Sequence, residues 1–76
     1  GKLSGFVFCL SGKVDKGRLT KQIEALGGVL ASSVGKKVSF LVAGEGSGSK
    51  SAAALELQAS GHHIKIIDSD ELEAMF

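Results

Sequence analysis

The sequence contains no proline, tryptophan or tyrosine, and it has a single cysteine, Cys9. One cysteine excludes a disulfide framework. Cys9 lies in the apolar run 6–10 without a histidine or basic residue beside it, so we expect a buried side chain and not a reactive nucleophile. No apolar run approaches the ~18 residues that a membrane span requires. We therefore expect a small domain without disulfide bonds or a membrane span, from a reducing compartment.

The chain has 76 residues, of which 43% are hydrophobic and 11 are glycine. This length supports one domain with one core, because two cores would not fit. A chain this short buries about 60% of the surface that its unfolded form exposes, so its core must be dense. The many glycines indicate tight turns and close backbone contacts. Since the sequence stops within a helical pattern at Phe76, we expect 1–76 to be a single domain cut from a longer protein.

The net charge of +1 conceals an asymmetry along the chain. Residues 1–38 carry seven basic and two acidic side chains, a net charge of +5, whereas residues 39–76 carry two basic and six acidic side chains, a net charge of −4. We expect a basic pole that attracts an anionic partner and an acidic pole opposite to it. The alternative is that both sets are solvated faces without a partner.

The first half of the chain predicts a strand followed by a helix. The continuous apolar run at 6–10 is typical of a central parallel strand that is covered on both faces. Asp15 then offers an N-cap, and apolar residues recur every three or four positions along one side of the helix. The residues of this stripe are Leu19, Ile23 and Leu26. Gly27 supplies a left-handed stop, and Gly28 allows the sharp turn that follows.

Three more strands and a final helix are predicted further along. The strands are expected at 29–31 (with Val34), 38–43 and 63–67. Asp68, followed three residues later by Glu71, resembles a capping box at the start of the last helix. The inward side chains of this helix are predicted to be Leu72, Met75 and Phe76.

A glycine-rich loop and a second helix are predicted between the third and fourth strands. Ser49 or Ser51 is the expected N-cap of this helix, and Gly61 is its stop. The side chains predicted to face the sheet are Ala52, Leu55 and Ala59. Because alanine is small, the helix is expected to lie close to the sheet.

The predicted order of elements is therefore β-α-β-β-α-β-α. Strand–helix–strand units imply parallel pairing and right-handed crossovers. We predict an α/β fold of three layers, in which a four-stranded parallel sheet is flanked by helices.

The stretch Gly44–Ser51 approaches the phosphate-binding loop G-x-x-x-x-G-K-[ST] but misses it at one position. Ser49 stands where the second glycine belongs, and serine tolerates that backbone conformation poorly. Asp68 is the one acidic residue placed to hold a metal ion, and capping already explains it. A nucleotide-binding domain is the least favoured interpretation, and no cofactor is expected. His62 and His63 lack further ligands at metal-binding spacing, so no metal is expected either.

Ser11 and Gly12 follow the first strand, at the edge where ligands gather in open α/β sheets. The next helix directs its N-terminal amides to this edge, so a hydroxyl and a free glycine amide are suited to hold a phosphate group. The alternative is that this pair simply ends the strand. The candidate phosphate- or DNA-binding residues are Ser11, Gly12, Lys13, Lys16, Arg18, Lys21 and Lys50. Gly27 and Gly28 are predicted to be structural, and no residue is predicted to be catalytic.

Three segments resemble the BRCT family, and together they cover nearly the whole chain. They are Leu3–Gly12, Ile23–Gly28, and Val34–Gly44 with Ser49 and Lys50. The glycine pair after an amphipathic helix and the Leu-Val-Ala-Gly end of a strand are fairly specific features. The motifs are most similar to the single BRCT domains of NAD-dependent DNA ligases, of the clamp-loader large subunit and of poly(ADP-ribose) polymerases.

This resemblance implies a non-catalytic interaction module of a DNA-repair or replication protein. The partners that it implies are proteins, phosphopeptides or DNA ends, without a membrane. The location would be the nucleus of a eukaryote or the cytoplasm and nucleoid of a bacterium. The rival interpretation is a purely protein-binding domain, for dimerisation or scaffolding, in a poly(ADP-ribose) polymerase-like parent.

Two departures from the family pattern bear on the ligand. The last helix of BRCT domains often carries tryptophan, and Leu72 most nearly holds that position here. Phosphopeptide-binding pairs of BRCT domains add a lysine well inside the second helix to the serine or threonine and the glycine after the first strand. Glu56 and Gln58 stand where that lysine is needed, and Lys50 lies at the start of the helix. The phosphopeptide pocket is therefore predicted to be incomplete.

Overall fold

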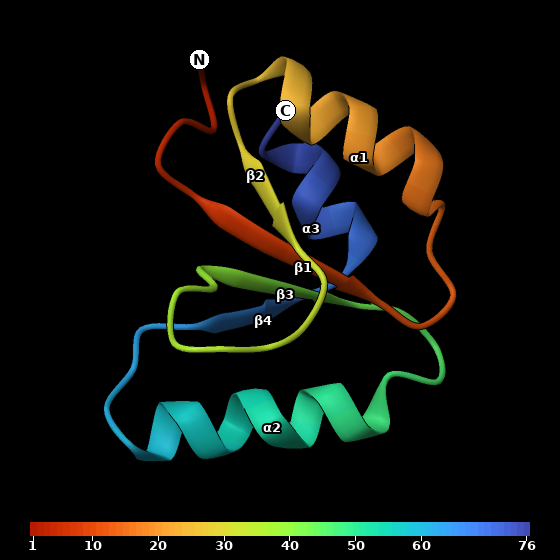
Figure 1. The fold of residues 1–76 in the computed structure, drawn as a ribbon. Helices are drawn as coiled ribbons and strands as arrows, with labels where there is room; N and C mark the ends of the chain where they lie inside the picture. Colours follow the sequence, from red (N-terminus) through yellow and green to blue (C-terminus); the bar gives the residue numbers. More distant parts are fainter.

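The computed structural model describes residues 1–76 as one sheet with helices on both faces (Figure 1). The elements are β1 (Val7–Ser11), α1 (Lys16–Ala25), β2 (Val29–Ala31), β3 (Phe40–Ala43), α2 (Gly48–Ala59), β4 (Lys65–Ile67) and α3 (Ser69–Ala74). All four strands are parallel, in the order β2-β1-β3-β4. The predicted order of elements and the predicted parallel sheet are confirmed.

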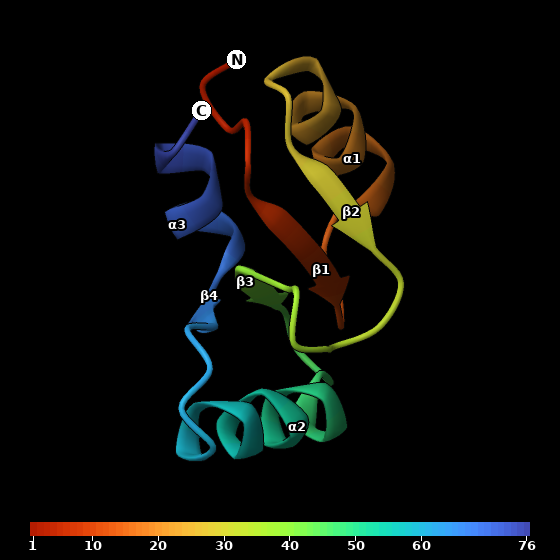
Figure 2. The ribbon, with the colours of Figure 1, turned by 60° about the vertical axis from the view of Figure 1, so that its left-hand side comes forward.

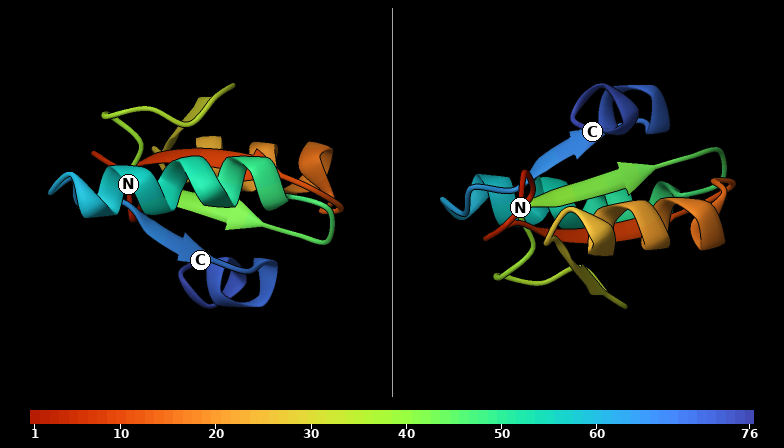
Figure 3. Two further views of the ribbon diagram at one scale, coloured as in Figure 1. Left: turned by 90° about the horizontal axis from the view of Figure 1, so that it is seen from below. Right: turned by 90° about the horizontal axis from the view of Figure 1, so that it is seen from above.

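The sheet forms the middle of three layers. α1 and α3 cover one face and α2 covers the other (Figure 2). On the shared face, α1 lies over the β2 side and α3 over the β4 side, as the views from below and above show (Figure 3). β1 and β3 occupy the centre and are covered from both faces, which explains their nearly continuous apolar sequences. The longest helix, α2, has 12 residues and is too short to cross a membrane.

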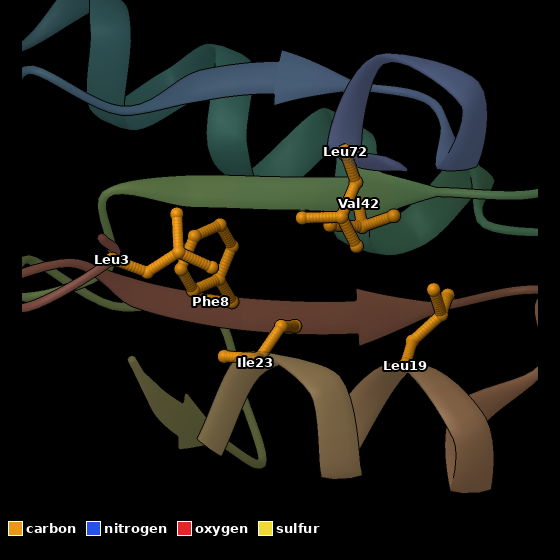
Figure 4. Close-up of a cluster of buried hydrophobic side chains, with 6 residues drawn as sticks. All are labelled: Leu3, Phe8, Leu19, Ile23, Val42 and Leu72. Atoms are coloured by element: carbon orange, nitrogen blue, oxygen red, sulfur yellow. The ribbon is translucent and has the colours of Figure 1, made fainter. Parts of the chain in front are cut away.

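The larger core lies between the sheet and the helices α1 and α3 (Figure 4). Its buried side chains are Leu3, Phe8, Leu19, Ile23, Val42 and Leu72. The ring of Phe8 stacks on that of Phe40 with centroids 5.3 Å apart. Leu72 is fully buried, as predicted, and the half-buried Met75 and Phe76 pack against the same cluster.

The smaller core lies between the sheet and α2. Ala54 is fully buried there with Cys9 and Leu41, and Leu57 packs against the same cluster. The small side chain of Ala54 allows the close approach of helix and sheet that the alanine run predicts. The complete burial of Cys9 confirms that its thiol belongs to the core.

The face of α2 that the sequence predicts to lie inward points to solvent instead. Leu55 is 56% exposed, and Ala52 and Ala59 are exposed as well. The prediction is wrong because three successive alanines and two leucines at i and i+2 permit two different apolar stripes. The structure buries the stripe with Ala54 and Leu57, which is rotated by about 200° from the predicted one, since each residue turns the helix by about 100°.

Asp15 and Gly27 begin and end α1 as predicted. The Asp15 carboxylate accepts a hydrogen bond from the Arg18 N–H at 3.3 Å. Gly27 has φ +89°, and the N–H groups of Gly27 and Gly28 donate to the carbonyl oxygens of residues 24 and 23 at 3.0 and 2.9 Å. This Schellman arrangement satisfies carbonyl groups that the end of the helix would otherwise leave free.

The start of α2 differs from the prediction. Ser47 is the N-cap and the helix begins at Gly48, so Ser49 and Ser51 lie inside its first turn and do not cap it. The Ser47 hydroxyl makes no capping bond to the backbone, and its Oγ lies 3.4 Å from the Ser51 Oγ. Three serines within five residues offer three similar caps, and residue type alone does not choose among them.

The capping box predicted for α3 is present. The Asp68 carboxylate accepts from the Glu71 N–H at 2.7 Å, and the Glu71 carboxylate accepts from the Asp68 N–H at 3.1 Å. The reciprocal pair satisfies two donors at the helix start and directs the chain from β4 into α3.

Two of the strands are shorter at their amino ends than the sequence predicts. β3 begins at Phe40 and not at 38, β4 begins at Lys65 and not at 63, and Val34 lies outside β2. Ser39 explains part of the difference, because its Oγ accepts the Val7 N–H at 3.0 Å in place of a backbone carbonyl. The regular pairing of β3 with β1 therefore starts at Phe40.

Replacing Gly27 by valine should lower the free energy of unfolding by ~1–2 kcal/mol, because a β-branched residue is forced into the left-handed region. A Cβ at this position would also meet the Ser4 Oγ at 2.5 Å. Urea denaturation followed by circular dichroism measures the loss. The control is Gly17→Ala in α1, where a Cβ meets nothing within 4 Å and the helix should gain up to ~1 kcal/mol. Equal stabilities of Gly27→Val and wild type would show that α1 ends elsewhere.

Candidate anion-binding site

The carboxyl ends of β1 and β3 lie side by side, with Ser11 in register with Ala43. The two loops that follow cross each other closely. Gly12 has φ +74°, and a Cβ there would meet the Gly44 carbonyl oxygen at 2.6 Å. A Cβ on Gly44 would meet the Lys13 carbonyl oxygen, also at 2.6 Å. The crossing therefore requires glycine at both positions.

A backbone bridge holds the two loops together. The Lys13 N–H donates to the Glu45 carbonyl oxygen at 2.8 Å, and the Gly44 N–H donates to the Ser11 carbonyl oxygen at 2.9 Å. The start of the Gly44–Ser51 stretch thus packs on the β1–α1 loop, and its end forms the first turn of α2.

Two polar groups at this edge have no partner within the chain. Ser11 is 2% exposed and its Oγ makes no hydrogen bond. The N–H of Gly12 donates to no group either. Side chains alternate along a strand, so Ser11 lies on the same face as Cys9, the face that α2 covers. A buried polar group without a partner costs about 1–3 kcal/mol.

The amino end of α2 opens onto the same edge. Its first three N–H groups, those of Gly48, Ser49 and Lys50, have no acceptor, and Ser47 does not cap them. Free amides at this end carry the positive pole of the helix dipole. An anion such as phosphate is the chemical group that such an arrangement stabilises.

Three of the predicted cations lie at this edge. Lys13 and Lys16 are exposed in the β1–α1 loop and at the first position of α1. Lys50, in the first turn of α2, reaches the end of β2, where its Nζ donates to the Ser32 carbonyl oxygen at 3.3 Å. Lys21 is five residues further along α1 than Lys16, which places it ~7.5 Å away along the helix axis.

Arg18 is engaged in ion pairs and is not free at the edge. Its Nη1 lies 3.1 Å from the Glu73 Oε1 of α3, and its Nε lies 3.5 Å from the Asp15 Oδ2. The hydrogen bond and the charge of Glu73 raise the pKa of the Arg18 guanidinium above its ordinary value. Because this pair joins the basic half of the chain to the acidic half, the expected separation into two poles is incomplete.

Sequence reasoning missed two contributors to this edge. Gly44 is needed for the loop crossing, and Glu45 adds an exposed carboxylate beside the lysines. A signal for Gly44 existed, since it directly follows β3 as Gly12 directly follows β1. No group of three or more His, Cys, Asp or Glu side chains is placed to share a metal ion. Amides, a hydroxyl and ammonium groups instead suit an anion.

Comparison with known proteins decides the family. The family model of the BRCA1 C Terminus (BRCT) domain matches residues 1–76. The chain belongs to the BRCT family. It is 41% identical over 76 residues to a DNA ligase of Synechococcus sp. (strain CC9902), covering 96% of the chain and 10% of the ligase. It is 38% identical over 77 residues to a DNA ligase of Thermosipho africanus (strain TCF52B), covering 97% of the chain and 11% of the ligase.

This BRCT domain thus spans about a tenth of the length of the curated relatives that it matches. Among solved structures, it is similar to the crystal structure of Rad4 BRCT1,2 in complex with a Crb2 phosphopeptide. The TM-score is 0.81 at 24% sequence identity, over 97% of this chain and 39% of that chain. The likeness supports the three-layer fold. BRCT domains are non-catalytic modules, in agreement with the sequence prediction.

Replacing Ser11 by alanine should raise the free energy of unfolding by up to ~1 kcal/mol, because it removes a buried hydroxyl that has no partner in the fold. Thermal melting of both proteins measures the difference. The matched control is Ser39→Ala, which should be destabilised by ~1 kcal/mol, since the Ser39 Oγ accepts the Val7 N–H. A loss of stability in Ser11→Ala would mean that its hydroxyl is satisfied in the folded protein.

Proposed function

We propose that this BRCT domain is a binding module that brings a DNA-repair or replication protein to DNA, and that it holds a phosphate group of the DNA. The observation that carries the proposal is the set of unpartnered donors at the carboxyl edge. The Ser11 Oγ, the Gly12 N–H and the first amides of α2 all lack acceptors. A phosphate oxygen is an acceptor that matches them.

The lysines of this edge supply the charge. Lys13 and Lys16 are exposed and have no ion-pair partner. Lys50 donates to a neutral carbonyl oxygen, and a charged phosphate oxygen would replace that oxygen with a stronger acceptor. A terminal phosphate carries up to two negative charges, so these groups would bind a DNA end more tightly than an internal phosphate.

The similarity to DNA ligases supports DNA as the partner. Each of these relatives is about ten times as long as this domain, so the domain corresponds to one module of a larger protein. The parent is proposed to act on DNA, in the cytoplasm and nucleoid if it is bacterial like these relatives.

The α2 sequence favours DNA over a phosphopeptide. Glu56 is exposed at one of the positions where a phosphopeptide pocket needs a lysine. Gln58 at the other position donates from Nε2 to the Ile64 carbonyl oxygen at 2.7 Å. Neither side chain supplies a cation, and Lys50 is more than one turn nearer to the helix start. A ligand held near the amino end of α2 therefore fits better than one held along the helix.

The affinity for a short duplex with a 5′-phosphate should fall with rising salt. If Lys13, Lys16 and Lys50 each pair with a phosphate, the slope of log affinity against log salt is near −2.7. Lys50→Gln should reduce the slope by about 0.9, whereas Lys2→Gln, which removes the same charge near the chain termini, should leave it unchanged. Fluorescence anisotropy at several salt concentrations measures the slope for the wild type and for each variant. A flat salt dependence of the wild type would rule the proposal out.

The rival function is protein docking, and the exposed stripe of α2 favours it. Leu55, 56% exposed, lies between Ala52 and Ala59 on an uncovered helix face. Docking through such an apolar face would survive moderate salt and tolerate lysine substitutions, which separates it from DNA binding.

A further inference from the structure

Three segments far apart in the sequence meet at the amino edge of the sheet, opposite the anion-binding site. Ser39 joins them: its N–H donates to the Val7 carbonyl oxygen at 2.7 Å, and its carbonyl oxygen accepts the Lys65 N–H at 3.0 Å. The start of β1, the turn before β3 and the start of β4 therefore lie side by side. The β2–β3 loop also lies against the end of α2, because Gly35 and Lys36 line one cavity together with Leu57 and Ser60.

This edge carries three unpaired cations. Lys36, Lys37 and Lys65 are exposed and make no ion pair or side-chain hydrogen bond. Lys36 lines a cavity of about 300 Å³ together with Ser60 at the end of α2, and the next turn brings His62 and His63 to the same edge. Glu56, which lines this cavity too, is the one carboxylate on the segments that form the edge.

No single structural role accounts for all three lysines. A lysine on an edge strand discourages aggregation, which accounts for Lys65 on β4. Lys36 and Lys37 lie in a turn, where no strand edge needs protection. Like charges placed together repel each other unless an anionic partner offsets them.

An exposed aromatic ring lies next to one of these cations, Lys65. Phe6, 40% exposed, packs edge-to-face on Phe40 with ring centroids 5.5 Å apart. Phe40 is in register with Lys65 on the neighbouring strand, which places the ring beside Lys65 on the face of the sheet that α1 and α3 cover. Cations that follow a backbone and aromatic rings that stack on bases are the two components of single-strand binding sites.

We propose that the amino edge of the sheet binds single-stranded nucleic acid, with Lys36, Lys37 and Lys65 contacting phosphates and Phe6 stacking on an unpaired base. The surface is distinct from the site at Ser11, because the five residues of β1 separate the two edges by ~17 Å. A duplex does not expose base faces to Phe6, so the unpaired strand is the preferred ligand.

The test uses an unphosphorylated oligothymidine of about 16 nucleotides, which offers no terminal phosphate to the Ser11 edge. For the triple variant Lys36→Gln, Lys37→Gln and Lys65→Gln, the slope of log affinity against log salt should decrease in magnitude by about 2. Phe6→Leu keeps the apolar contact with Phe40 but loses the aromatic face, and its affinity should fall about fivefold or more. Fluorescence anisotropy measures both effects, and circular dichroism checks that each variant is folded.

A charge control makes the result specific. The triple variant Ala52→Glu, Leu55→Glu and Ala74→Glu changes the net charge equally at exposed positions away from this edge, and its slope should match that of the wild type. The proposal is wrong if the wild type does not bind oligothymidine or if both triple variants weaken binding equally. Unchanged binding by Phe6→Leu would also overturn it.

Discussion

Gly12 and Gly44 let two loops cross where the central strands β1 and β3 end, with hypothetical Cβ contacts of 2.6 Å in both directions. No side chain fits at either position. The crossing fixes where α1 and α2 begin relative to the sheet, because each helix starts a few residues after its glycine. It also fixes the positions of Ser11, the Gly12 amide and the first amides of α2. The candidate site thus follows from backbone packing as much as from the chemistry of its side chains.

Polar groups have hydrogen-bond partners in some parts of this small domain and lack them in others. The ends of α1 and the start of α3 satisfy their backbone groups through a Schellman motif and a capping box. At the carboxyl edge, the Ser11 hydroxyl, the Gly12 amide and the start of α2 are left without partners. A domain of this size has little stability to spare. Unsatisfied groups gathered at one place therefore point to a ligand, since binding sites commonly sacrifice local stability.

The fold was largely predictable because its signals are local. The apolar run of β1, the N-cap Asp15 and the stop at Gly27 each depend on a few neighbouring residues, and all are present in the structure. The face of α2 was not predictable, because alanines at 52–54 make two stripes nearly equivalent until the sheet is placed against one of them. The N-cap of α2, predicted at Ser49 or Ser51, lies at Ser47 for a similar reason, since several serines compete locally.

The site shows the same division between local and long-range information. Ser11 and Gly12 could be selected from their place at the end of an apolar strand, although β1 extends through Ser11 and ends one residue later than predicted. Their location at the carboxyl edge of the sheet follows from the parallel topology. The ion pair of Arg18 with Glu73 joins residues 55 positions apart, so the sequence gives no sign that this cation is neutralised. The grouping of Lys36 and Lys37 with Lys65 likewise depends on the pairing of β3 with β4.

NMR chemical-shift mapping with a short 5′-phosphorylated duplex tests the role of the carboxyl edge most directly. The account predicts that the largest amide shifts occur at Gly12 and Lys13 and at residues 48–50 of α2, and that they saturate together with one dissociation constant. Shifts confined to the outer face of α2 around Leu55, or no shifts at Gly12 and the start of α2, would contradict it.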